Sequence, residues 1–81
     1  MQAPRYYFNL RHGHLHVPDS RGEECPGPRE AIEHAVVAIL DLVAGEKRLR
    51  NWAKWSVEIE DERHCRVAIL PFTLVLKTRH H

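Results

Sequence analysis

The sequence predicts an α+β domain in which one helix packs on a small antiparallel sheet, in the order strand-strand-helix-strand-strand. Two observations lead to this fold class. Segments in which apolar and polar residues alternate lie near both ends of the chain, as in half-buried strands. Between them lies a single segment with apolar residues at helical spacing. The chain has 81 residues, enough for one domain (1–81), with an ordered core expected from about residue 4 to 76 and a mobile tail or tag at 77–81.

The first two strands are predicted at residues 5–11 and 14–17, because apolar side chains alternate with polar ones in both. If Leu10 and Leu15 both face the core, they must oppose each other, since opposed residues share one face of a sheet. This register predicts a two-residue turn at His12-Gly13, in which glycine takes a positive φ at little cost. Residues 18–27 have no periodicity and form the connection to the helix.

The helix is predicted to begin at Pro28 and to stop at Gly45. Proline suits the first helical position, where its missing N–H would have no partner, and glycine is common just beyond a helix end. Val37 lies off the apolar stripe. The stripe consists of Ala31, Ile32, Ala35, Val36, Ile39, Leu40 and Val43.

Two further strands are predicted at residues 55–61 and 65–72. Opposing Ile59 to Val67 requires a three-residue loop, 62–64, whose last residue, His64, takes the left-handed backbone conformation. Cys65 then points inward, and the same register opposes Glu60 to Arg66. Residues 73–77 are predicted as a further short strand or turn. The predicted core consists of Tyr6, Phe8, Leu10, Leu15, Val17, Ile32, Val36, Ile39, Leu40, Val43, Trp55, Val57, Ile59, Val67 and Ile69.

Charge balance, apolar run lengths and cysteine content argue against several classes of function. Twelve basic and eleven acidic side chains give a formal net charge of +1, which argues against a general nucleic-acid binder. No apolar run approaches the ~20 residues of a membrane span, and the first residues lack a signal-peptide pattern. We therefore expect a cytoplasmic protein with no membrane contact. Its two cysteines, Cys25 and Cys65, are expected to be reduced thiols, with a bridge between them as the alternative.

Several landmarks resemble a known family. The chain contains PRYYFNLRHG, then PDSRGEE, one amphipathic segment, WSVEIEDE, and finally AILPF. This succession resembles a family of short alphaproteobacterial proteins classed as a domain of unknown function, over Pro4 to Phe72. Asp19, Gly22 and Glu24 match the family's Asp-x-x-Gly-x-Glu segment, whereas His12-Gly13 replaces the usual Asp-Gly and the glycine of the second turn is missing. The resemblance implies the architecture and carries no activity.

Catalytic and metal-binding chemistry is not expected. The fold offers little room for a concave site, and Asp19, Gly22 and Glu24 are interpreted as turn residues. The histidines at 12, 14 and 16 do not converge, and Arg11 beside His14 would repel a cation. We therefore predict a protein that is not an enzyme, with no cofactor and no metal.

The sheet face opposite the helix is the expected acting surface. We predict a non-enzymatic interaction or regulatory module that acts through this face as a homodimer or with another protein. The alternatives are a small antitoxin-like regulator associated with nucleic acid, which is not favoured, and a metal- or pH-responsive protein that uses its histidines. Ser56, Glu60, Ala68 and Leu70 are placed on this face together with the residues assigned to the interaction site, which are Arg5, Tyr7, Asn9, Arg11, His14, His16, Glu58 and Arg66.

Overall fold

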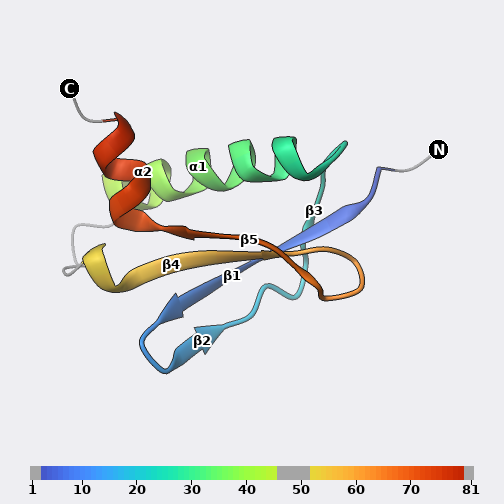
Figure 1. Ribbon diagram of the computed structural model, residues 1–81, viewed down its shortest axis with the longest axis horizontal. Helices are drawn as coiled ribbons and strands as arrows, with labels where there is room; N and C mark the ends of the chain where they lie inside the picture. Colours follow the sequence, from blue (N-terminus) through green and yellow to red (C-terminus); the bar gives the residue numbers. More distant parts are fainter. Residues whose placement is uncertain (1–2, 46–51, 80–81) are drawn as a thin grey trace.

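The computed structural model describes residues 3–45 and 52–79, which fold into an antiparallel sheet backed by two helices (Figure 1). The main strand order is β2-β1-β4-β5, and a short β3 pairs with the start of β1. The α+β class is confirmed, with one strand and one helix more than predicted. The elements are β1 (Arg5–His12), β2 (Leu15–Val17), β3 (Glu23–Glu24), α1 (Pro28–Gly45), the 3-10 helix η1 (Trp52–Lys54), β4 (Trp55–Glu60), β5 (Arg66–Pro71) and α2 (Phe72–Arg79).

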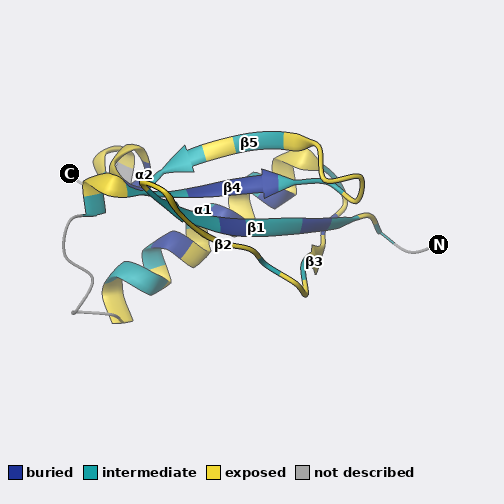
Figure 2. Cartoon of the chain, turned by 90° about the horizontal axis from the view of Figure 1, so that it is seen from below, coloured by how far each residue is buried: buried dark blue, intermediate teal, exposed yellow. Residues whose placement is uncertain are grey.

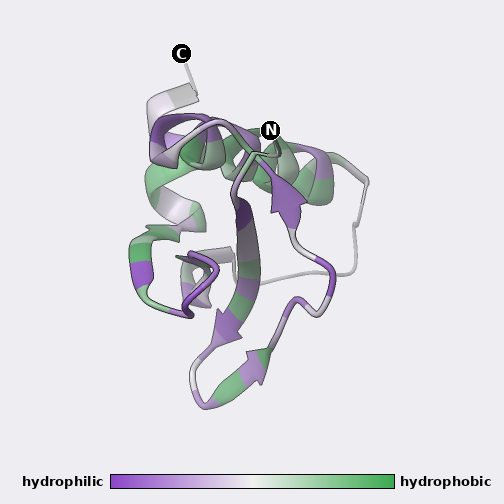
Figure 3. Ribbon diagram, turned by 90° about the vertical axis from the view of Figure 1, so that its right-hand side faces the viewer, coloured by the Kyte–Doolittle hydropathy of each residue, from purple (hydrophilic) through white to green (hydrophobic). Residues whose placement is uncertain are grey.

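Helix α1 begins and ends where the sequence predicts. Its buried residues, Ala31, Ala35 and Ile39, recur every fourth position, and the two alanines let the helix lie close to the sheet. The rest of the predicted stripe is partly buried, while Val37 is exposed as expected. Hydropathy alternates along β1, as the coloured bands of the ribbon in Figure 3 show, and Phe8 and Leu10 pack against the core on the side of this helix.

The first hairpin has a different register from the predicted one. Leu10 opposes Val17 rather than Leu15, and the two-residue turn is Gly13-His14. The physical reason lies in the turn, because Gly13 has a φ of 60° and a turn with glycine first is a tight hairpin type that matches strand twist. A shift of two residues keeps the remaining strand residues on their predicted faces. It moves His14, predicted on the outer face opposite Arg11, into the turn, and it brings His12 from the turn into β1. Nevertheless Leu15 and Val17 are 54% and 45% exposed, so their assignment to the core was wrong.

The second hairpin follows the prediction only near its turn. His64 has a φ of 62°, and Glu60 opposes Arg66, as predicted. A β-bulge then shifts the register, so that Ile59 opposes Ala68 rather than Val67. The extra residue reverses the faces of the following positions.

The second hairpin corrects four assignments, three of them through this reversal. Ala68 and Leu70 pair with Ile59 and Val57 on the helix side, although they were predicted to face outward. Ile69 pairs with Glu58 on the opposite face and is 42% exposed, although it was predicted in the core. Cys65 is exposed rather than buried, because it lies in the turn that Asp61 closes through its N–H to the Cys65 carbonyl at 3.0 Å.

The chain ends in a helix where a strand or turn was predicted. Phe72 and Val75 are buried one helical turn apart, and they bring α2 against α1 on the same side of the sheet. Pro71 ends β5, since proline cannot donate to a strand ladder. Regular structure therefore extends to Arg79, beyond the expected core. Residues 46–51, and the last two residues of the tail predicted at 77–81, lie outside the described residues.

Candidate functional site on the outer sheet face

The outer face of the sheet, defined as the side away from α1 and α2, is the candidate site. Figure 2 looks onto this face, with α1 behind the strands. Within residues 3–45 and 52–79, no helix lies over it. The strand registers place on it Tyr7, Asn9 and Arg11 of β1, His16 of β2, Ser56, Glu58 and Glu60 of β4, and Arg66 and Ile69 of β5.

Glu58 lies at the centre of a charged cluster, which we call the Glu58 cluster and which comprises Glu58, Arg11, His16 and Arg66. Oε2 of Glu58 accepts two hydrogen bonds from Arg66, from Nε at 2.9 Å and from a terminal guanidinium nitrogen at 2.6 Å. Oε1 lies 3.7 Å from Nε of Arg11 and 3.9 Å from Nε2 of His16. Glu58 is only 5% exposed, because its neighbours' side chains cover it from the solvent side.

The electrostatics of the cluster keep Glu58 ionised. The hydrogen bonds from Arg66 lower the pKa of Glu58 below its ordinary 4.5, and the charges of Arg11, Arg66 and His16 act in the same direction against the effect of burial. Two permanent cations therefore surround one anion. Nε of Arg11 is buried and has no hydrogen-bond partner among the described residues, because 3.7 Å is too long for a hydrogen bond.

Asn9 lies on the outer face but has a structural role. It is buried, and its Oδ1 accepts the backbone N–H of Asp19 at 2.9 Å. The Asp19 carboxylate in turn accepts the backbone N–H groups of Phe8, Arg21 and Gly22, each at 3.1 Å. Burial alone would raise the pKa of Asp19, but these donors lower it below 3.8. The geometry supports the interpretation of Asp19 and Gly22 as turn residues.

The remaining predicted site residues lie outside the Glu58 cluster. The ring of Tyr7 stacks on His64 at 5.3 Å, and Nδ1 of His64 lies 3.4 Å from Oε1 of Glu60. The Arg5 guanidinium is engaged by the loop before α1, because it donates to the Arg21 carbonyl at 2.8 Å. His14 lies exposed in the first hairpin turn. Ile69 was missed as a member of this face because the bulge that moves it outward leaves no mark in the alternation pattern.

In the described part of the chain, the two cysteines form no disulfide, and the histidine, cysteine and acidic side chains form no metal-ligand group. Cys25 is buried and Cys65 exposed, and both are free thiols. Burial, together with the charges of Glu23 and Glu30, raises the pKa of Cys25. No three histidine, cysteine or acidic side chains of the described residues come together as metal ligands. Neither described helix combines the length and apolar character required to cross a bilayer.

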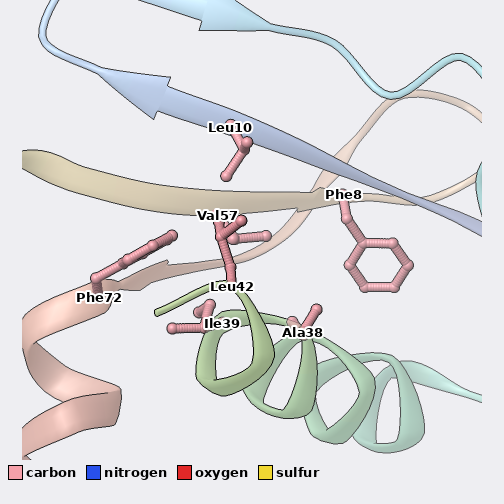
Figure 4. A pocket seen from close by; sticks show the side chains of 8 residues that line it. Phe8, Leu10, Ala38, Ile39, Leu42, Val57 and Phe72 are labelled. Atoms are coloured by element: carbon pink, nitrogen blue, oxygen red, sulfur yellow. The ribbon is translucent and has the colours of Figure 1, made fainter. Parts of the chain in front are cut away.

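The opposite face carries an apolar groove between α1 and the sheet (Figure 4). Its volume is about 240 Å³, and it is lined by Phe8, Leu10, Ala35, Ala38, Ile39, Leu42, Val57 and Phe72. None of these side chains can hold or transfer a proton. The groove therefore lacks the polar groups that fix a small ligand's orientation or that acid-base chemistry needs.

One comparison with known proteins gives a match. A family model described as a domain of unknown function, DUF6894, covers residues 5–73. The chain belongs to the DUF6894 family. The match extends from the first residue of β1 into α2 and includes all four residues of the Glu58 cluster. It confirms the membership in a domain of unknown function that the sequence landmarks imply. No curated protein and no solved structure matches the chain.

Proposed function

We propose that this DUF6894 domain is a non-enzymatic interaction module that binds a protein partner through its outer sheet face. The observation that carries the proposal is the composition of this face. The Glu58 cluster lies beside exposed Ile69, and Ile69 opposes Glu58 directly across β4 and β5. Protein interfaces combine arginine and aromatic side chains with apolar contacts in this way.

The charges of the face favour a different protein over a second copy of the chain. A twofold dimer places the same patch of both copies against itself. The Glu58 cluster holds two permanent cations and one anion, so a dimer that sets this cluster against its own copy would bring two positively charged clusters together. The homodimer is therefore the second candidate, and its test is light scattering over a range of protein concentrations.

Crosslinking from single positions tests the proposal. A photoreactive amino acid replaces Ile69 on the outer face in one protein and Val37 on α1 in another, since both side chains are exposed and apolar. When the two proteins are expressed in cells of the native organism, we expect a specific crosslinked adduct only from position 69. The protein in that adduct is then identified and purified as the partner.

Reconstitution with the purified partner completes the test. We expect Ile69→Glu to weaken binding more than about tenfold, as for a buried interface residue, and Val37→Glu to leave it unchanged. Equal adducts from both positions, or equal affinities of the two variants, would show that the outer face is not the binding surface.

A further inference from the structure

We infer that the outer face recognises a carboxylate on an acidic segment of the partner protein, and that Arg11 is the residue that binds it. This inference rests on the proposed function and adds the chemistry of the partner. It follows from a difference between the two arginines of the Glu58 cluster: Arg66 is hydrogen-bonded to Glu58, and Arg11 is not.

The two oxygens of Glu58 have different partners. Oε2 receives both hydrogen bonds from Arg66, while Oε1 has only the longer contacts to Arg11 and His16 at 3.7 and 3.9 Å. Arg66 is therefore committed to Glu58, and Arg11 is attracted by it without a hydrogen bond. One carboxylate cannot saturate two guanidinium groups, so the cluster retains positive charge on the side of Arg11.

Arg11 is placed to use this charge outward. Its Nε is buried without a hydrogen-bond partner in the described part of the chain, while 43% of its side chain is exposed. The base of the guanidinium is thus enclosed, and part of the side chain faces solvent. A guanidinium binds a carboxylate through two parallel N–H donors, and a side chain that is already partly enclosed loses less entropy on binding than a fully exposed one. His16, which opposes Arg11 across β1 and β2, lies beside the same position.

The surroundings favour an acidic peptide over nucleic acid. Glu60 lies on the same face outside the Glu58 cluster and would repel a continuous phosphate backbone, whereas a single carboxylate needs only the side of Arg11. Exposed Ile69 provides an apolar contact on the other side of Glu58. The expected segment carries an acidic residue close to an apolar one.

A peptide titration followed by NMR tests the inference on the whole chain. The probe is an acetylated and amidated peptide of sequence EELEELEE, and the comparison peptide is QQLQQLQQ. We expect the acidic peptide to shift the Arg11 Nε–H signal and the Ile69 signals saturably, and added salt to weaken the effect. Arg11→Gln should weaken binding about tenfold, as expected for the loss of one charge-assisted pair.

Matched variants and a competing ligand make the result decisive. Arg29→Gln removes an exposed arginine on α1 and should leave binding unchanged. If Arg11→Gln disturbs the fold, Arg11→Lys keeps the charge without the paired donors and should still bind more weakly than the native chain. The inference is overturned if the Arg11→Gln variant binds the acidic peptide as tightly as the native chain does, or if QQLQQLQQ binds the native chain as tightly as EELEELEE does. It is also overturned if an oligothymidylate shifts the same signals at lower concentration. If the acidic peptide does not bind but position 69 still gives a specific crosslink to the partner, this inference is rejected and the proposed function stands.

Discussion

The carboxylate of Asp19 accepts a hydrogen bond from the backbone N–H of Phe8 at 3.1 Å. On one edge β1 pairs with β4 along its length, but on the other edge Phe8 lies in the gap between β3, which pairs with Arg5–Tyr6, and β2, which pairs with Leu10–His12. The loop that follows β2 therefore takes the place of a strand at this point, through a side chain and not through its backbone. A single carboxylate keeps the edge of β1 satisfied and fixes the loop that leads to α1.

Replacing Asp19 should therefore destabilise the domain. Asp19→Ala removes the acceptor for three backbone N–H groups, and we expect a loss of about 1–3 kcal/mol in the free energy of unfolding. Urea denaturation measures it. Asp41→Ala, which truncates an exposed acid on α1, should change stability by less than about 0.5 kcal/mol. Equal effects of the two variants would contradict the role assigned to Asp19.

Gly22 should tolerate no side chain. Its φ is 70°, and a Cβ would lie 2.8 Å from both Cγ of Arg5 and the carbonyl oxygen of Tyr6. We expect Gly22→Ala to cost more than about 1 kcal/mol, since backbone strain and overlap add. Gly45→Ala meets no atom within 4 Å and should be neutral or stabilising by up to about 1 kcal/mol. Thermal unfolding of the pair checks this, and a stable Gly22→Ala protein would show that the loop adopts another conformation.

The sequence reveals which elements exist more reliably than how they register. The α1 stripe and the alternation in β1 and β4 repeat over several residues, so one exception does not hide them. Register depends on single backbone conformations, such as the positive φ of Gly13 and the bulge at the step between Ile59 and Glu60. No periodic signal reports these features.

Helix α2 shows how local alternation can mislead. Leu74 and Leu76 are separated by one residue, as in a strand, yet the buried positions are Phe72 and Val75, three apart. We expect Phe72→Ala to cost about 3–5 kcal/mol, because this fully buried ring lies against α1 and the sheet. Leu74→Ala, in the same helix but 51% exposed, should cost less than about 1 kcal/mol. Similar losses in urea denaturation would mean that α2 does not pack as described.

The candidate site was only partly accessible to sequence reasoning. Alternation assigns Arg11, His16 and Glu58 to one face, and a register error of two residues does not change that. Alternation cannot reveal that Glu58 becomes covered by its neighbours, because this depends on long side chains folding over it. It also misses Ile69, which reaches the outer face only through the bulge.

Acid should destabilise the domain through Asp19 and Glu58. Both carboxyls have a pKa below their ordinary values of 3.8 and 4.5 in the folded chain. The unfolded chain therefore takes up these protons first, so the stabilisation is complete above the ordinary pKa values and is lost as the pH falls through the lower folded values. We expect the urea concentration at the midpoint of unfolding to decrease once the pH is below about 4. The Asp19→Asn, Glu58→Gln double variant should show a shallower fall, and an unchanged slope would exclude these two groups as its source.

The two thiols should differ sharply in reactivity. Cys25 is buried where its backbone N–H donates to the Pro4 carbonyl at 3.0 Å, and burial raises its pKa, so little thiolate is available for attack. Cys65 lies exposed in the β4–β5 turn. We expect iodoacetamide to modify Cys65 alone in the folded protein and both thiols in urea, with mass spectrometry to locate the adducts. Cys65→Ser should abolish the native reaction and Cys25→Ser should leave it intact. Rapid native modification of Cys25 would show that the segment between β3 and α1 opens more readily than the burial of Cys25 implies.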